Sequence, residues 1–257
     1  MAMQRPPMSK RWMLPAVAIA LVASLALNLW LARELRDGFV ALQLARLFPL
    51  GYTRDPQRPD VAGTPESVVF YGDSRASTWS EAGLTAQRRS ENRAHGAQTA
   101  SQTLLQLQSA PAVHSGVAVV QVGINDLHPL GAMPAHKEEV LRRLRASIPQ
   151  IRDRLLERSD LVVLTTIFPP GPVSWSRRHA WDAETLRYIS DINATIRRAA
   201  EHDRVVLLDA HALLAGPDAY LQSAYRDPFF LHVNAAAYAR LNAELANLMA
   251  NHRRHDR

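Results

Sequence analysis

The feature that most constrains the fold of this chain is a set of four short, nearly continuous apolar runs that alternate with helical patterns. The runs are Val68 to Tyr71, Val117 to Val122, Leu161 to Ile167 and Val205 to Leu208. Apolar runs without alternation are typical of strands that are covered on both faces. The helical segments between them are Thr99 to Gln108, His136 to Arg158 and Ala183 to Glu201. Strand followed by helix, repeated, predicts an α/β fold with a parallel sheet and right-handed crossovers.

Two weaker signals extend this pattern. A further strand is expected near Arg88 to Arg93, and a helix from about Asn234 to Asn251 closes the chain. The charge-rich segment between residues 137 and 158 is expected to be a solvated helix face, because its glutamates precede its arginines at helical spacing.

An uncharged apolar segment, Trp12 to Ala32, precedes these elements. As a helix it would span about 30 Å, the thickness of one hydrocarbon core. Only basic charges precede it, whereas the charges that follow it cancel, so the positive-inside rule keeps residues 1–11 in the cytoplasm. We therefore expect a single-pass signal-anchor over residues 12–32 of the cytoplasmic (inner) membrane, with the folded part on the periplasmic, extracytoplasmic side. The alternatives are a buried core helix and a signal peptide cleaved after Ser24-Leu25-Ala26, although the apolar run continues past that site.

Residues 33–65 are expected to connect this segment to the folded domain. Leu35, Phe39, Leu42 and Leu47 recur at near-helical spacing and indicate a helical stalk. A linker rich in proline and glycine follows, so the folded domain is expected to begin near Glu66 and to run to residue 252.

Charge and composition exclude several classes of protein. The formal net charge of +6 comes from the two ends of the chain, because residues 61–250 hold nineteen basic and nineteen acidic side chains. A domain without surplus positive charge does not have the basic patch of a nucleic-acid binder. Cysteine is absent, so the chain has neither disulfides nor a thiolate metal site.

The first apolar run ends in Gly72-Asp73-Ser74. Ligands of open parallel sheets bind beyond the carboxyl ends of the strands, which is where Ser74 falls. A helix N-cap explains the same residues without any chemistry. The surrounding sequence is neither a Gly-x-Ser-x-Gly elbow, because Ala76 replaces the last glycine, nor a phosphate-binding loop.

Three other loops hold residues that suit acyl chemistry. Asn125 follows the run that ends at Val122, and its amide could face a reacting carbonyl oxygen. Gly96 could bring its backbone N–H close to a substrate, although a turn explains it equally well. His232 precedes the last helix and could act as a general base, with Asp227 as the acid that fixes its tautomer. Asp126 and Asp209 are expected to brace or cap loops.

Taken in order, GDSR, NRAHGA, GIND and HVNAAAY resemble the four signature blocks of the SGNH hydrolases, also called the GDSL esterase/lipase family, over residues 66 to 250. The resemblance implies a three-layer α/β/α sandwich, SGNH/flavodoxin-like, around a mostly parallel sheet of about five strands. It also implies Ser74 as the nucleophile, His232 as the base, and the N–H groups of Ser74, Gly96 and Asn125 as the oxyanion hole.

The chain departs from this family pattern at the position of the acid. The family has Asp-x-x-His, but Phe229 stands three residues before His232, and Asp227 lies two residues further back. Arg75 also replaces the usual leucine after the serine, and Ala94 stands where a glycine is common.

These observations predict a membrane-anchored serine ester hydrolase that acts through an acyl-serine and needs no cofactor or metal. Its substrate would be a small-molecule, lipid or glycan ester, with the aromatic and basic segment at residues 169–181 near the substrate. The alternatives are an envelope-glycan O-acyltransferase and a non-catalytic SGNH-fold envelope protein that lacks the usual acid.

Overall fold

The computed structural model describes residues 10–49, 64, 67–79, 89–109, 114–178 and 180–255, without the side chains of residues 10–12, 176 and 253–255. The chain divides into two compact units, Met1–Gln43 and Leu44–Arg257. The expected proline-rich linker lies almost wholly outside the described residues.

The second unit contains a five-stranded, all-parallel sheet with the strand order β2-β1-β3-β4-β5. The strands are β1 (Val68–Gly72), β2 (Ser90–Asn92), β3 (Ser115–Gln121), β4 (Ser159–Thr165) and β5 (Val205–Leu208). All five strands were expected from the sequence, including the weak one. The apolar run Leu161 to Ile167, which forms β4, leaves the sheet before Ile167 because the N–H of Ile167 is bound by the side chain of Asn193 instead of a neighbouring strand.

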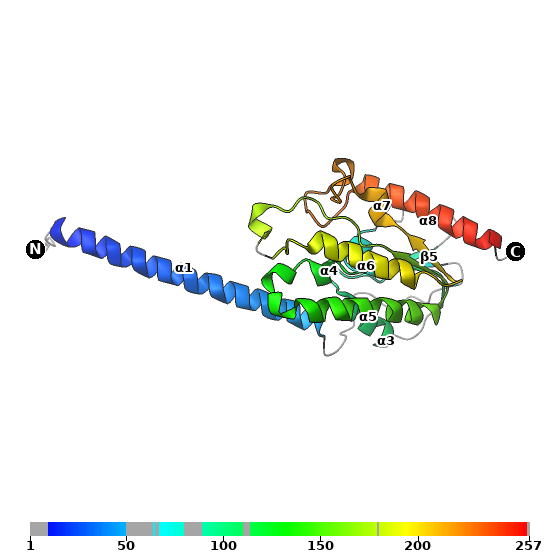
Figure 1. Cartoon of the computed structure of the whole chain (residues 1–257), viewed down its shortest axis with the longest axis horizontal. Helices are drawn as coiled ribbons and strands as arrows, with labels where there is room; N and C mark the ends of the chain where they lie inside the picture. The colour runs from blue at the N-terminus through cyan, green and yellow to red at the C-terminus, as the bar shows by residue number, and fades with distance from the viewer. Residues whose placement is uncertain are drawn as a thin grey trace, which may run out of the picture. The chain divides into compact units, whose positions relative to one another are not determined.

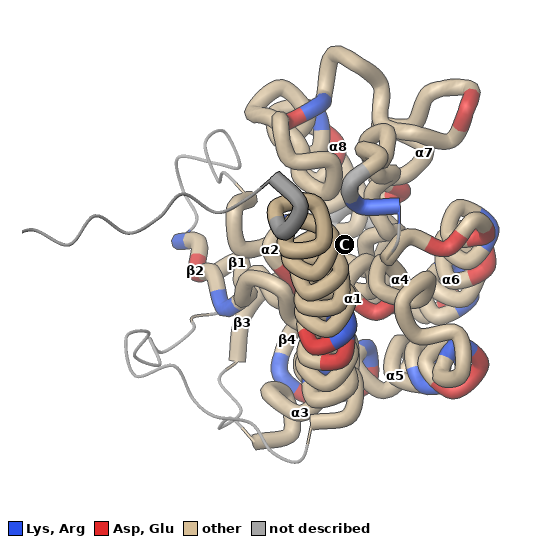
Figure 2. The backbone as a smooth tube through the Cα atoms, turned by 90° about the vertical axis from the view of Figure 1, so that its left-hand side faces the viewer, with Lys and Arg blue, Asp and Glu red and all other residues tan. Residues whose placement is uncertain are grey.

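Helices cover both faces of this sheet. The longer helices are α3 (Ala100–Ser109), α5 (Lys137–Leu156), α6 (Thr185–Ala199) and α8 (Ala235–His255), and the short ones are α2 (Ser74–Ser77), α4 (Ile124–Leu127), α7 (Ala210–Leu214), η1 (Leu130–Ala132), η2 (Pro134–His136), η3 (Trp175–Arg177) and η4 (Ser223–Tyr225). Helices α3, α5 and α6 lie together on one face, and α7 and α8 lie on the other (Figures 1 and 2). The fold is therefore the expected three-layer α/β/α sandwich.

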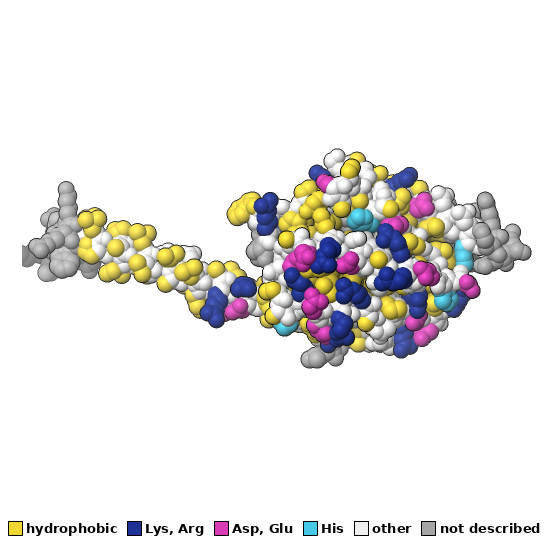
Figure 3. Space-filling model, viewed as in Figure 1, with side chains coloured by type: hydrophobic (Ala, Val, Ile, Leu, Met, Phe, Trp, Pro, Cys, Tyr) yellow, Lys and Arg dark blue, Asp and Glu magenta, His cyan; other side chains and the backbone are white. Residues whose placement is uncertain are grey.

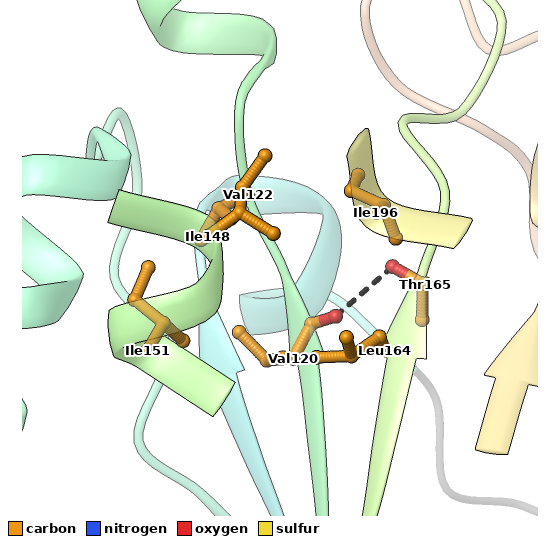
Figure 4. Close-up of a pocket in the computed structure, with 7 residues that line it drawn as sticks. All are labelled: Val120, Val122, Ile148, Ile151, Leu164, Thr165 and Ile196. Carbon is orange, nitrogen blue, oxygen red and sulfur yellow. Dashed lines mark hydrogen bonds between the residues drawn. The ribbon is translucent and has the colours of Figure 1, made fainter. Parts of the chain in front are cut away.

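Alternate strand residues face the two helical layers, which produces two cores. Phe70, Val119 and Val163 pack with Tyr238 and Leu241 of α8 in one of them. The other core holds a small internal cavity, which is lined by Val120, Val122, Ile148, Ile151, Leu164, Thr165 and Ile196 (Figure 4). This lining is apolar apart from Thr165, whose hydroxyl donates to the carbonyl of Val120. None of the expected site residues lines the cavity.

The first unit consists of most of one long helix, α1 (Lys10–Leu47). From Met13 onward α1 is long and apolar enough to cross a membrane, with a mean hydropathy of 2.1 in its apolar window. From Met13 to Leu35 its large apolar side chains are exposed, whereas charged side chains dominate the visible surface over α5 and α6 (Figure 3). A span of this kind near an N-terminus is also the property of a signal sequence.

Two glycines shape the carboxyl edge of the sheet, where the chain leaves β1 and β3. Gly72 and Gly123 have φ values of +126° and +113°, which other residues rarely adopt. Gly72 also lies opposite Gln121, and a Cβ atom on Gly72 would be 1.8 Å from the carbonyl oxygen of Gln121. The close approach of β1 and β3 at this edge therefore depends on glycine at position 72.

Replacing Gly72 by alanine should destabilise the fold by at least about 2–3 kcal/mol, because the added carbon collides with backbone and the φ value becomes strained. Chemical unfolding followed by tryptophan fluorescence would measure the loss. Gly96→Ala is the matched control, since a Cβ atom there meets nothing within 4 Å. Equal stability of the Gly72→Ala and Gly96→Ala variants would contradict this account of the edge.

Candidate active site

Three of the four sequence blocks meet at the carboxyl edge of β1 and β3. The N–H of His95 donates to the carbonyl of Gly72 at 2.9 Å, which docks the second block on the end of β1. The side-chain amide of Asn125 donates to the carbonyl of Gln98 at 3.0 Å, which joins the third block to the second. These contacts hold the loops that carry Ser74, Gly96 and Asn125 next to one another.

The fourth block brings an imidazole to the serine. The Nε2 atom of His232 lies 3.1 Å from the Oγ atom of Ser74, although the two residues are 158 positions apart. Ser74 is the first residue of α2, and Asp73 caps this helix by accepting from the N–H of Arg75 at 2.8 Å. Capping and the presentation of the hydroxyl are thus performed by neighbouring residues of the same turn.

The expected oxyanion donors have free capacity in this arrangement. One proton of the Asn125 amide is used by Gln98, which leaves a second N–H on the same nitrogen. The N–H of Ser74 is in the first turn of a helix, where no helical carbonyl accepts it. Gly96 is exposed and has open space where its side chain would be. Their joint action on one oxygen stays a prediction.

Phe229, at the usual position of the acid, packs against the base. Its ring centroid is 4.7 Å from that of the His232 imidazole. The carboxylate of Asp227 accepts from the N–H of Phe229 at 2.9 Å, and no hydrogen bond joins it to His232 among the described residues. The charge of Asp227 acts on the imidazole and offsets part of the lowering of the His232 pKa that burial and Arg75 cause.

The residue after the serine has a larger structural role than the sequence suggested. Arg75 is 0% exposed. Its guanidinium donates from Nε to the carbonyl of Leu231 at 2.5 Å and from Nη1 to the carbonyl of Phe168 at 2.6 Å. Leu231 directly precedes His232, so Arg75 ties the serine helix to the histidine loop. Tyr238 of the fourth block donates to the carbonyl of Arg75 at 2.8 Å and reinforces this connection.

The electrostatic environment keeps the imidazole neutral. Burial lowers the pKa of His232, and the charge of Arg75 lowers it further, against the opposing effect of Asp227. Burial raises the pKa of the Asp73 carboxyl to about 7, although Arg75 and the amide of Gln121 favour its charged form. A neutral imidazole next to a hydroxyl has the protonation state of a general base.

Two further aspartates accept hydrogen bonds from backbone N–H groups and so brace or cap helices, as expected. Asp209 caps α7 by accepting from the N–H of Ala212 at 3.1 Å. Asp126 accepts from the N–H of Ala100, the first residue of α3, at 3.0 Å. Burial raises the pKa of Asp126 to about 7. Within the described ranges, no three His, Asp or Glu side chains gather as a metal site would require.

The loop after β4 lies against the histidine loop. The N–H of Gly171 donates to the carbonyl of Phe230 at 2.6 Å, and Trp181 packs on the Phe230 ring. Arg177 stacks over Phe229, while Trp175 is 84% exposed. The two tryptophans thus differ, since Trp181 belongs to the local core and Trp175 does not.

Two parts of the site were missed in the sequence. Helix α4, with four residues, is too short to show a periodic pattern. The burial of Arg75 was also missed, because arginine is rarely fully buried without a partner. The only signal was its place directly after the serine, where the family has an apolar residue.

Residues 61–240 match the sequence model of the GDSL-like lipase/acylhydrolase family. No curated protein matches the chain. A GDSL-like lipase from Bacteroides thetaiotaomicron is similar in structure, with a TM-score of 0.57 and 16% identity over 84% of this chain and 97% of that one. A carbohydrate acetylesterase from Sinorhizobium meliloti has a TM-score of 0.56 and 15% identity, over 72% of this chain and 99% of that one. An acetylxylan esterase from Geobacillus stearothermophilus has a TM-score of 0.53 and 16% identity, over 72% of this chain and 94% of that one.

Replacing Asp126 by asparagine should flatten the pH dependence of the free energy of unfolding. The folded-state pKa of about 7 is above the ordinary value of 3.8, so this carboxyl group stabilises the fold below pH 4 and the contribution is lost as the pH rises through 7. The asparagine oxygen can still accept from Ala100 but does not titrate. Between pH 5 and 8, wild type should lose about 2 kcal/mol more than Asp126→Asn in chemical unfolding. Equal losses would exclude Asp126 as the titrating group.

Proposed function

Because this chain belongs to the GDSL-like lipase/acylhydrolase family, we propose that it is a serine ester hydrolase, anchored by residues 12–32 to the outer face of a cytoplasmic membrane. The observation that carries this proposal is the 3.1 Å separation between Ser74 Oγ and His232 Nε2. A hydroxyl and a neutral imidazole at hydrogen-bond distance form the minimal pair for nucleophilic acyl transfer.

In the proposed reaction, His232 accepts the proton of Ser74 as the hydroxyl oxygen attacks the ester carbonyl. The N–H groups of Ser74, Gly96 and Asn125 stabilise the negative charge on the carbonyl oxygen. The protonated imidazole then donates its proton to the departing alcohol, which leaves an acyl-serine. Water, deprotonated by the same imidazole, attacks the acyl group and releases the acid and free Ser74.

The acid of the usual triad has two functions, and here we assign one of them to Arg75. An acid orients the imidazole and stabilises its protonated form. The hydrogen bond from Arg75 to the carbonyl of Leu231 fixes the backbone directly before His232 and so supports the orientation. The second function is not supplied by Arg75, because its positive charge opposes protonation of the imidazole. Only the negative charge of Asp227 favours the imidazolium.

The membrane part of the proposal comes from α1, whose apolar stretch from Met13 is long enough to cross a bilayer. The charge distribution around residues 12–32 supports an orientation with the folded unit outside the cytoplasm. A carbohydrate acetylesterase and an acetylxylan esterase have the same fold, which supports a short acyl ester of a glycan as the substrate class of an envelope enzyme.

A second candidate function follows from Phe229. An imidazole that packs on a phenyl ring and has no acid bound to it is also what a non-catalytic protein of this fold would retain after loss of activity. Reactivity of Ser74 separates the two functions, because only an activated serine reacts rapidly with a mechanism-based probe.

The full-length protein in detergent should react with a fluorophosphonate probe and hydrolyse short p-nitrophenyl esters, and Ser74→Ala should abolish both. Removal of the nucleophile of a serine hydrolase lowers the rate by roughly 10⁶-fold. Mass spectrometry of the labelled protein would locate the adduct. Ser77→Ala, on the same short helix, is the matched control and should keep the adduct. Unlabelled, folded wild-type protein would support the non-catalytic function.

Replacing Arg75 by leucine should raise the inflection of the acidic limb in the pH profile of kcat/KM. The charge of Arg75 lowers the pKa of His232, so its removal allows the imidazole to stay protonated to higher pH. Loss of the bonds to Leu231 and Phe168 should also reduce kcat by roughly ten- to a hundredfold.

Asp227→Asn provides the control of opposite sign. Its charge raises the pKa of His232, so the amide should move the same inflection to lower pH. The measurement is the pH profile of kcat/KM between pH 4 and 9 for wild type, Arg75→Leu and Asp227→Asn, and the compared quantity is the inflection of the acidic limb. An inflection that moves in the same direction in both variants would mean that loop structure, and not charge, controls the imidazole.

A further inference from the structure

Arg177, which has no acidic partner among the described residues, stacks on the ring that packs against the proposed base. The guanidinium carbon of Arg177 is 4.6 Å from the centroid of the Phe229 ring and 5.4 Å from that of Phe230. The side chain of Arg177 is exposed, and no carboxylate of the described part of the chain lies within ion-pair distance of it. A guanidinium that stacks on a ring by its face keeps the N–H groups at its edge available for an anion.

Phe229 connects this arginine to the site. The ring that carries Arg177 is the ring that packs 4.7 Å from the imidazole of His232. In the proposed reaction the imidazole gives its proton to the departing alcohol, so the alcohol portion of the ester lies on the side of His232. The contact through the Phe229 ring therefore puts Arg177 on the side of the departing alcohol in the proposed reaction.

The positive charge of Arg177 also acts on a second imidazole, that of His128. His128 follows Asn125 by three residues, and its buried Nδ1 atom has no hydrogen-bond partner within the described chain. Burial, together with the charges of Arg177 and Arg46, lowers the pKa of His128 to about 4. Arg177 thus acts on His128 as an uncompensated positive charge, which agrees with the absence of an ion pair for Arg177 among the described residues.

We propose that Arg177 binds an anionic group, a carboxylate or a phosphate, on the alcohol portion of the ester substrate. This inference rests on the proposed esterase function and narrows its substrate class to esters of acidic alcohols, such as sugars or glycerols that carry a carboxylate or a phosphate. The stack on Phe229 holds the guanidinium in place, and its planar fork matches the two oxygens of either anion. Phe229 thereby replaces the usual acid with a platform for a substrate-binding cation.

Asp227 lies two residues before Phe229 and is therefore a candidate for neutralising this cation, but its hydrogen bonding argues against that role. Its Oδ1 atom accepts from the N–H of Phe229, and no ion pair joins it to Arg177. Arg178 follows Arg177 at the end of η3 and is also exposed, but it has no aromatic platform among the described residues. Arg178 is therefore the matched control for charge alone.

The test uses the full-length protein in detergent with three acetyl esters: 4-acetoxybenzoate, 4-acetoxyphenyl phosphate and neutral methyl 4-acetoxybenzoate. The measured quantity is kcat/KM of each anionic ester divided by kcat/KM of the neutral one. Arg177→Gln should lower this ratio about 5- to 10-fold relative to wild type, as expected for loss of one charged hydrogen-bonding partner near solvent. Arg177→Lys should retain part of the preference, and Arg178→Gln should retain all of it. The two anionic arms show whether carboxylate or phosphate fits better.

A ratio that Arg177→Gln leaves unchanged, or that Arg178→Gln lowers equally, would overturn the proposed subsite. Labelling of Ser74 by fluorophosphonate in each variant shows that the site is still folded. Hydrolysis of none of the three esters by wild type, without labelling of Ser74, would instead refute the esterase function on which the subsite rests. A wild-type preference that weakens with added salt would support direct charge recognition.

Discussion

The arrangement of the site depends on one buried guanidinium. Arg75 is enclosed completely, and its hydrogen bonds reach the carbonyls of Phe168 and Leu231, which belong to the loops after β4 and before α8. Enclosing a charge is costly unless hydrogen bonds and an opposite charge compensate, and Asp73 is the buried carboxyl group beside it. Because the same residue continues the helix of Ser74, the positions of the hydroxyl and of the histidine loop are linked through a single side chain.

Two of the three departures from the family pattern, Arg75 and Phe229, both act on the loop that carries His232. An apolar residue after the serine could not bind the carbonyl of Leu231, and an acid at position 229 would place a carboxylate where Arg177 now stacks on a ring. Arg75 stabilises the loop through its backbone, while Phe229 supports the imidazole by packing. In the proposed site, orientation of His232 thus needs no hydrogen bond from an acid, and the charge of Asp227 supplies part of the stabilisation of the imidazolium.

The sequence predicted the sheet, the longer helices and the pairing of Ser74 with His232, because continuous apolar runs and ordered motifs report on strands and their carboxyl ends. It could not predict that Arg75 is buried, since arginine usually lies at the surface and its partners here are backbone carbonyls with no sequence signature. The same applies to the stack of Arg177 on Phe229. That contact joins segments about fifty residues apart, and neither residue type alone indicates it.

Positive charge around His232 has opposing effects on the two halves of the proposed reaction. Arg75 disfavours the imidazolium that forms when Ser74 loses its proton, which weakens His232 as a base. The same charge favours the negative oxygen of the tetrahedral intermediate, which forms in the same step. Because the pKa of His232 is lowered, a larger fraction of the imidazole is neutral and reactive at acidic pH. The neutral imidazole is at the same time a weaker base. An enzyme built in this way is suited to good leaving groups or to substrates whose own anion compensates the surplus charge.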